Sequence, residues 1–307
     1  MERLRRYSQY FFAIVANSYW LFPWKGPIYR GLAKHVCLPG LNCYSCPAAI
    51  TACPLGALQN FLATFRYNLA AGHGKPGLYV LGTLALTGSF LGRMPCAWLC
   101  PFGLIQEFML RLPLPKFRVW RPLRYGPFVF LGLFVILLPL LVLDPAGFGV
   151  TWFCKYVCPA GTLEGGIPLL LMNSGLRRAA GLLFMHKLVI LVLILTWSAM
   201  TSRPFCRTIC PLGAILGLFN RVSWFQLRFH GDRCLDCRAC NTICPTDVSF
   251  YDGKDSINSP ACIRCMRCVT ACPGGAVSYK FGPYLLDEEE YGLKDEQTDS
   301  TGNAQQG

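Results

Sequence analysis

Residues 206–213 read Cys-Arg-Thr-Ile-Cys-Pro-Leu-Gly, an outline of two cysteines, a proline and a glycine that recurs along the chain. It is repeated as CKYVCPAG at 154–161 and as CAWLCPFG at 96–103, and a shorter copy, CPLG, occurs at 53–56. The four Cys-Pro pairs lie 47, 58 and 52 residues apart, and each follows an apolar segment. The spacing predicts an internal repeat of apolar segment, cysteine corner (the Cys-Pro-x-Gly step) and short semi-apolar stretch.

The apolar segments predict a polytopic α-helical membrane protein. Of the 307 residues, 53% are hydrophobic and only 15% are charged, whereas soluble domains carry about a quarter charged residues. Apolar stretches at 8–24, 77–92, 126–143 and 182–200 are the candidates for about four spans. A bilayer core of about 30 Å needs roughly 20 apolar residues in a helix, because backbone groups in lipid must be satisfied internally. The first two stretches are short, so whether they cross fully stays open.

The basic side chains lie between these apolar segments, which argues against a nucleic-acid partner. The net charge is +13, and its placement is typical of positive charge beside a lipid bilayer. Thirteen Lys and Arg residues fall on one predicted side and eight on the other, so the positive-inside rule places both termini in the cytoplasm. The basic and then apolar N-terminus predicts an uncleaved anchor.

The 18 cysteines indicate metal ligation rather than disulfides, because they stand in short regular spacings in a chain without a visible small secreted domain. Proline is favoured in the first turn of a helix, so each corner predicts a helix start lying along the membrane face. The corner cysteine would meet free backbone N–H groups there, which favour a negative sulfur or cluster. The two cysteines of a corner, at i and i+4, would share one helical face.

The predicted topology sorts the corner cysteines into two sets. Four thiolates make one complete iron–sulfur ligand set, and the inner side supplies exactly four, at Cys96, Cys100, Cys206 and Cys210. The outer side supplies candidate ligands at Cys43, Cys46, Cys53, Cys154 and Cys158. Ligation by the nearby Cys37 is left open. Redox-active thiol chemistry and a structural role remain alternatives for both sets.

The C-terminal part contains a doubled cysteine run, CLDCRACNTICP at 234–245 and CIRCMRCVTACP at 262–273. This is the bacterial two-cluster ferredoxin pattern, in which the fourth cysteine of each run ligates the other cluster. Zinc is the alternative, but it prefers closed four-ligand sets and fits a doubled run poorly. The pattern predicts one [4Fe-4S] cluster on Cys234, Cys237, Cys240 and Cys272, and a second on Cys262, Cys265, Cys268 and Cys244.

With corners between apolar segments and a doubled ferredoxin run, the chain resembles the membrane-bound ferredoxin-type electron-transfer proteins over about residues 77–280. These include the quinol-oxidising iron–sulfur subunit of periplasmic nitrate reductase, its methylamine-utilisation relative, and the C-terminal half of the nitrous-oxide-reductase regulator. The resemblance implies a multi-pass protein of a prokaryotic cytoplasmic membrane, with its ferredoxin domain in the cytoplasm. It also implies electron exchange with quinone or with redox partner subunits. The N-terminal block CLPGLNCYSCPAAITACPLGALQ departs from the family pattern.

We therefore predict four regions: an anchor and cysteine-rich block (1–76), a membrane domain (77–227), an α+β ferredoxin domain (228–282) and a disordered acidic tail (283–307). The predicted function is that of an electron-carrier subunit in anaerobic respiration, with quinol dehydrogenation as its nearest enzymatic activity. A membrane-tethered redox sensor or metalloenzyme maturation factor is the alternative. If clusters lay on opposite faces of a 30 Å core, either the corners would dip inward or a quinone would bridge them. Roles for Glu107, Glu164 and His186 as proton or cofactor sites are left open.

Overall fold

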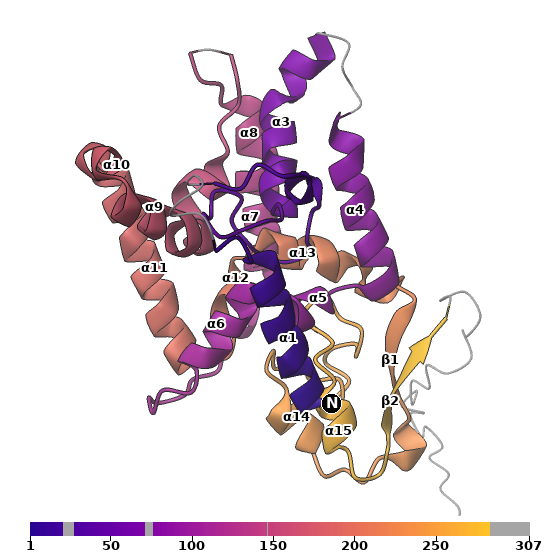
Figure 1. Cartoon of the computed structure of the whole chain (residues 1–307). Coiled ribbons are helices and arrows are strands. Elements are labelled where there is room, and N and C mark those ends of the chain that lie inside the picture. Colours follow the sequence, from indigo (N-terminus) through magenta and orange to yellow (C-terminus); the bar gives the residue numbers. More distant parts are fainter. Residues whose placement is uncertain (21–27, 71–75, 146, 283–307) are drawn as a thin grey trace, which may run out of the picture.

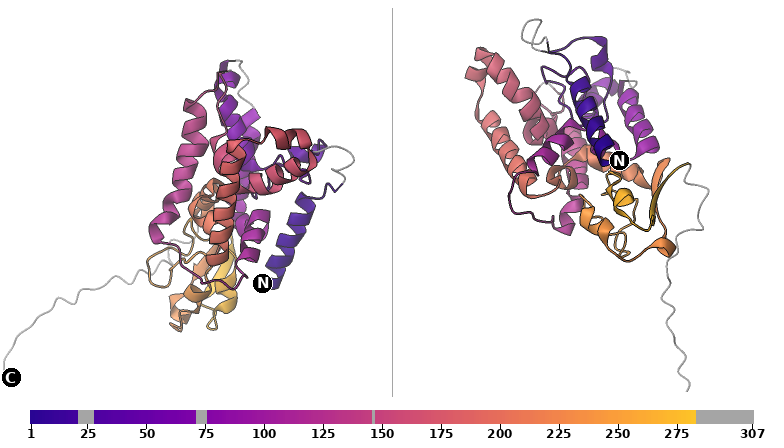
Figure 2. Two further views of the ribbon diagram at one scale, coloured as in Figure 1. Left: turned by 90° about the vertical axis from the view of Figure 1, so that its left-hand side faces the viewer. Right: turned by 60° about the horizontal axis from the view of Figure 1, so that its bottom comes forward.

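The computed structural model describes residues 1–20, 28–70, 76–145 and 147–282. Helices form an elongated body, and a small α+β module built from the C-terminal residues caps one end of it (Figure 1). Two further views show the module at the same end of the long axis (Figure 2). The cysteine corners lie between this module and the far ends of the long helices, where α5 (Pro95–Trp98), α12 (Pro204–Thr208) and α13 (Pro211–Leu218) meet.

Each cysteine corner begins a helix, as its proline predicts. The helices that start at the corners are α3 (Pro54–Ala70), α6 (Pro101–Met109) and α13, and helical backbone also begins at Pro159. The proline occupies a first-turn position, where no backbone N–H is needed. Corner prolines therefore set both the start of each helix and the place of the cysteine before it.

The prediction that the two cysteines of a corner share one helical face is wrong. Cys96 lies within α5, whereas Cys100 is the extended N-cap of α6, with φ −70° and ψ 116°. Cys206 in α12 and Cys210 before α13 repeat this arrangement. The physical reason is the proline itself, because its ring disfavours helical backbone at the residue before it.

Two apolar helices in the described part of the chain are long enough to cross a membrane. One runs continuously over Arg121–Leu141, and the other is α11 (Leu182–Met200). Only 17% and 22% of their apolar windows are buried, and Leu182 and Leu193 are 86% and 63% exposed, whereas a core helix of a soluble domain is mostly buried. The predicted stretch 77–92 forms a shorter apolar helix, α4 (Pro76–Leu91). Membrane association is therefore supported by two helices, and a four-span topology stays a prediction.

The N-terminal helix differs from the predicted apolar stretch at 8–24. Helix α1 begins at Glu2 and ends at Ala16, and part of the predicted stretch, 21–27, lies outside the described residues. Arg5 and Gln9 are completely buried on the face that packs against α5 and α6. Arg5 forms a buried ion pair of 2.9 Å with Glu107. The inward face of helix α1 carries the charged side chain of Arg5. Glu107, 102 residues further along the chain, neutralises that charge.

The remaining helical segments link these elements. The long apolar stretch comprises η2 (Arg121–Tyr125), α7 (Gly126–Phe130), the π-helix η3 (Leu131–Leu137) and α8 (Leu138–Leu141). Between it and α11 lie the π-helices η4 (Phe153–Val157) and η5 (Gly161–Gly166), then α9 (Ile167–Met172) and α10 (Ser174–Ala179). Short 3-10 turns occur at η1 (Leu32–His35), η6 (Phe219–Arg221) and η7 (Gly231–Arg233).

The C-terminal module has the predicted α+β character. Strands β1 (Phe225–Phe229) and β2 (Val277–Phe281) pair antiparallel, with Phe225 opposite Phe281, and the short helices α14 (Ala239–Ile243) and α15 (Arg267–Ala271) pack together beside them. The module sits tightly against α13: a Cβ added at Gly217 would lie 2.7 Å from the carbonyl oxygen of Pro260. One hydrophobic core runs from the corners into the module. The predicted acidic tail, 283–307, lies outside the described residues.

Candidate metal centres

The two ferredoxin runs fold into the same unusual backbone. Asp236 and Arg238 in the first run have φ values of 52° and 55°, and Arg264 and Met266 in the second run have values of 51° and 63°. Left-handed backbone is uncommon for such residues and is retained mainly at functional sites. Alternating right- and left-handed residues turn successive N–H groups into one concavity, as anion and iron–sulfur sites require. Both loops are therefore shaped for a negative group held among their cysteines.

The fourth cysteine of each run ends a helix and accepts a backbone hydrogen bond. Cys244 follows α14 and accepts from the N–H of Val248 at 3.4 Å, while Cys272 follows α15 and accepts from Ala276 at 3.2 Å. A cavity in the module is lined by four cysteines, Cys244, Cys262, Cys265 and Cys268. The structure thus brings the last cysteine of the first run to three cysteines of the second, which is the set predicted for the second cluster.

The four inner corner cysteines also converge. Cys96, Cys100, Cys206 and Cys210 are each at most 6% exposed. Burial, with the neighbouring Cys206 and Cys96 thiols, raises the pKa of Cys100 to about 12. Burial also raises the pKa of Cys210 well above its usual value, and Cys206, Cys96 and Cys100 add to the effect. We call these four residues the inner set. Buried thiols grouped in this way keep their protons in the absence of a metal, and they release them to solvent when a metal binds.

Two buried arginines link the two corners of the inner set, because each one bonds to the opposite corner. The sequence analysis did not identify them. Arg93 donates to the carbonyl oxygen of Cys206, and Arg203 donates to the carbonyl oxygen of Cys96. Each arginine stands three residues before the first cysteine of its own corner and bonds to the other corner. A signal was present in the sequence, because RMPCAWLCPFG at 93–103 and RPFCRTICPLG at 203–213 share the pattern Arg-x2-Cys-x3-Cys-Pro-x-Gly. Two guanidinium charges there compensate part of the negative charge of four thiolates.

The corner glycines have a common task. At all four corners the glycine three residues after the cysteine donates its backbone N–H to the cysteine sulfur, from Gly56, Gly103, Gly161 and Gly213. These are first-turn N–H groups, which have no partner within the helix. In the inner set a side chain would also collide, because a Cβ at Gly213 would lie 2.6 Å from Nη2 of Arg93. The glycine therefore admits both the sulfur and the arginine.

A second group of cysteines gathers where the N-terminal block meets the third corner. Gly161 lies between two of them, since a Cβ there would be 3.8 Å from the sulfur atoms of both Cys158 and Cys43. Cys154, Cys43 and Cys53 all help to raise the pKa of Cys158, after burial. We call Cys43, Cys53, Cys154 and Cys158 the outer set.

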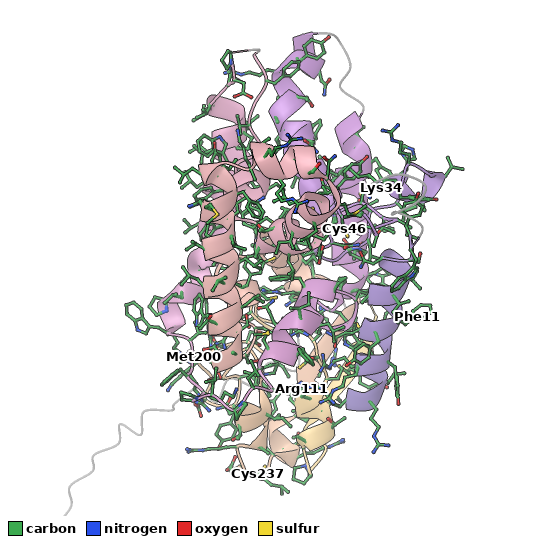
Figure 3. All side chains as sticks on the ribbon, turned by 60° about the vertical axis from the view of Figure 1, so that its left-hand side comes forward. Phe11, Lys34, Cys46, Arg111, Met200 and Cys237 are labelled. Carbon is green, nitrogen blue, oxygen red and sulfur yellow. The ribbon has the colours of Figure 1, made fainter. Side chains whose placement is uncertain are left out.

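Two neighbouring cysteines are placed differently from the outer set. Cys46 adjoins Cys43 and adds to the rise in the pKa of that thiol, but its own sulfur lies 3.7 Å from Oδ1 of Asn17 and close to Lys34. Cys37 is half-buried and pairs through its backbone with Ala52. Figure 3 shows Cys46 beside Lys34 and far along the molecule from Cys237 of the module. Four of the five predicted outer ligands lie around the third corner, and the fifth, Cys46, lies beside Cys43.

Consecutive backbone amides join the two sets. The N–H of Leu41 donates to the sulfur of Cys100 at 3.4 Å. The next N–H, that of Asn42, faces the sulfur of Cys53 and favours its thiolate form. The inner and outer sets therefore adjoin across a single peptide unit.

The three other candidate residues have different surroundings. Glu107 is ion-paired with Arg5 and with Arg203, at 2.7 Å for Arg203, and these arginines outweigh burial to lower its pKa. Glu164 is half-buried, accepts the N–H of Cys43 at 2.7 Å, and has a pKa raised by desolvation to about 8. His186 is exposed on α11. Glu107 thus serves a structural ion pair, whereas Glu164 touches the outer set.

Across the described ranges, no three His, Cys, Asp or Glu side chains are placed to hold a single metal ion. A lone zinc ion needs all of its sulfur ligands about 2.3 Å from one point. A [4Fe-4S] cluster instead takes one thiolate at each of four separate irons, so its ligands stand further apart. The backbone N–H groups that face these sulfurs fit the negative charge of an iron–sulfur cluster.

Gln106 offers a direct probe of the inner set. It is completely buried, and its Nε2 donates to the sulfur of Cys206 at 3.1 Å. Hydrogen bonds to cluster sulfurs raise the reduction potential, so Gln106→Met, which keeps the volume and removes the donor, should lower it by roughly 40 mV if about 1 kcal/mol is lost. An EPR-monitored redox titration measures this shift, with the module's own potentials as the internal control. An unchanged potential at unchanged iron content would contradict the assignment.

Comparison with known protein families assigns the same regions to iron–sulfur binding. A 4Fe-4S dicluster domain matches residues 226–273, and a 4Fe-4S binding domain matches three times, at 75–119, 125–170 and 184–230. Each of these three ranges contains one complete corner, and together the matched ranges cover more than half of the chain. The N-terminal block at 37–59 precedes all of them.

Three curated relatives share this region. An uncharacterized protein of Methanocaldococcus jannaschii is 29% identical over 201 residues, which are 62% of this chain and 73% of that protein. The putative electron transport protein YccM of Escherichia coli is 24% identical, over 72% of this chain and 60% of its own length. The regulatory protein NosR of Pseudomonas aeruginosa is 27% identical over 60% of this chain but only 24% of its own length. No solved structure matches this chain.

Proposed function

This chain belongs to the ferredoxin-type 4Fe-4S proteins, and we propose that it relays electrons between its outer set and its ferredoxin module by way of the inner set. When bound, each [4Fe-4S] cluster supplies a one-electron redox centre. The chain itself supplies sixteen cysteines in four sets, which are spaced along one axis of the molecule. The hydrogen bond of Leu41 to the inner set, with the adjacent N–H of Asn42 facing the outer set, carries this proposal.

The inner set and the ferredoxin module are in direct contact. Arg93, which bonds to Cys206, also donates to the carbonyl oxygen of Pro260 in the module at 2.6 Å. Trp98 stands between Cys96 and Cys100, and its indole N–H donates to the carbonyl oxygen of Arg264 at 3.1 Å. Arg264 lies within the second ferredoxin run, one residue before Cys265. One side chain therefore spans the gap from the inner corner to the loop of the second module cluster.

The step between the inner and outer sets is equally short. Adjacent backbone nitrogens lie within about 4 Å of one another, and N–H···S bonds add about 3.5 Å on each side. The sulfur atoms of Cys100 and Cys53 therefore lie within roughly 11 Å. That distance is about a third of a bilayer core of roughly 30 Å. A quinone is thus not needed as a bridge between the sets.

The outer set is the end of the relay at which we place the external partner. Quinone or an extracytoplasmic redox subunit would exchange electrons there, and the two exposed apolar helices would hold the protein in a prokaryotic cytoplasmic membrane with the module in the cytoplasm. Glu164 contacts Cys43 of the outer set. It is therefore our candidate for the acid that takes up or releases a proton when an electron moves at this end. The Escherichia coli relative is named a putative electron transport protein, which agrees with this function.

Iron and acid-labile sulfide in the anaerobically purified full-length protein test the proposal. Four loaded sets require roughly sixteen irons per chain, and the module alone requires roughly eight. Addition of a quinol analogue should then reduce the module clusters, as followed by EPR. A value near eight irons would overturn the relay and leave a membrane-tethered redox sensor, the function suggested by the regulatory relative, as the better account.

A further inference from the structure

A basic pocket of about 390 Å³ opens where the long apolar helix begins, next to the ferredoxin module. Its wall combines the start of that helix with the loop of the module that carries Asp255 and Pro260. Five basic side chains line it, Arg93, Arg121, Arg124, Arg207 and Lys254. None of the cysteines of the four sets is among its lining residues.

The positive charge of this basic pocket is only partly compensated. Asp255 is the one carboxylate in its lining, and it pairs with Arg124 at 2.9 Å and with Arg121 at 3.8 Å. Just beside it, Asp247 pairs with Arg207 at 2.7 Å. Because Arg93 also faces the inner set, the other four cations against two carboxylates leave an excess of two positive charges in a half-enclosed space. Such a concentration attracts an anion.

The deep wall of the basic pocket is built from buried guanidinium groups, since Arg93 and Arg207 are 4% and 5% exposed. Guanidinium groups match phosphate oxygens in geometry and charge, so the donor set fits a phosphate.

The remaining wall of the basic pocket is apolar and leads onto the long helix. Tyr125, Pro127 and Phe128 line it, and Val129 on the next turn is 60% exposed. A ligand with a phosphate at the arginines and hydrocarbon along this helix would match both walls. Basic pockets at the ends of membrane helices bind anionic lipid headgroups in this way.

We propose that the basic pocket binds a phosphate group, carried by an anionic phospholipid or by a free phosphate ion. The apolar wall favours the phospholipid. Because the pocket joins the helix start to the module loop, the bound ligand would fasten the module to the membrane domain beside the inner set. The proposal does not depend on the electron relay, since its residues are present whether or not clusters are loaded.

Lipid binding to the delipidated full-length protein tests this proposal. Dioleoylphosphatidylglycerol in mixed micelles, zwitterionic dioleoylphosphatidylcholine and sodium phosphate are titrated separately, and the thermal unfolding midpoint is recorded for each. The double variant Arg121→Gln/Lys254→Gln removes two exposed lining charges without touching the buried arginines. We expect it to weaken phosphatidylglycerol binding about tenfold or more. Arg111→Gln, an exposed basic residue outside the lining (Figure 3), should bind like the natural protein.

The separate titrations with phosphatidylglycerol and with sodium phosphate distinguish the two sources of the phosphate group. Stabilisation by phosphatidylglycerol alone supports a lipid headgroup site, and stabilisation by sodium phosphate as well supports a site for free phosphate. Equal stabilisation by the zwitterionic lipid, or equal binding by the double variant and the natural protein, overturns the proposal. So does the absence of a response to both phosphatidylglycerol and phosphate.

Discussion

Serine in place of Cys206 should remove roughly four irons from each chain and stop electron passage between the outer set and the ferredoxin module. Cys206 is buried in the centre of the inner set, where it influences Cys96, Cys100 and Cys210 and accepts the hydrogen bond of Gln106. A serine hydroxyl lacks the soft thiolate that iron–sulfur clusters require. The eight module cysteines keep their own loops, so the module clusters should remain.

Iron analysis and EPR of the anaerobically purified Cys206→Ser protein measure both effects. Dithionite should still reduce the module clusters, whereas a quinol analogue should no longer do so. Cys37→Ser is the matched control, because Cys37 lies in neither set. Its backbone forms a bridge with Ala52. A Cys206→Ser protein with full iron content, or with an intact response to the quinol analogue, would show that the inner set does not lie on the electron path.

The local chemistry of the corners was readable from the sequence. Proline in the first turn predicted the helix starts at Pro54, Pro101 and Pro211, and the structure confirms them. The doubled cysteine run predicted an α+β module with two matching loops. The fourth cysteine of each run has to reach the loop of the other run, so the chain must fold back on itself. These features depend on neighbours within a few residues, which is the range over which a single sequence is informative.

Features built from distant partners were missed or misread. The ion pair of Arg5 with Glu107 was missed because the two residues lie 102 positions apart in the sequence. Arg93 passed unnoticed because its carbonyl partner, Cys206, lies 113 residues away. The bridge at Leu41 and Asn42 is made by backbone N–H groups, which every residue except proline possesses. No sequence pattern could have marked it.

Serine in place of Cys43 should remove the outer cluster, whereas serine in place of Cys46 should leave it intact. The sequence placed both cysteines among five candidates for four ligand positions. In the structure the sulfur of Cys43 faces the third corner across Gly161, whereas that of Cys46 points to Asn17 and Lys34. A cluster takes one thiolate per iron, so the fifth cysteine has no iron to bind.

The pair Cys43→Ser and Cys46→Ser is its own matched control, because the two cysteines stand three residues apart in one loop. Iron should fall by roughly four per chain in the first variant and stay unchanged in the second. The module clusters and the inner set report that the rest of the chain has folded. Loss of iron in Cys46→Ser with retention in Cys43→Ser would reassign the ligand, and equal iron in both variants would show that this N-terminal block binds no cluster. In that last case the relay would begin at the inner set, and Leu41 would serve only to cap the sulfur of Cys100.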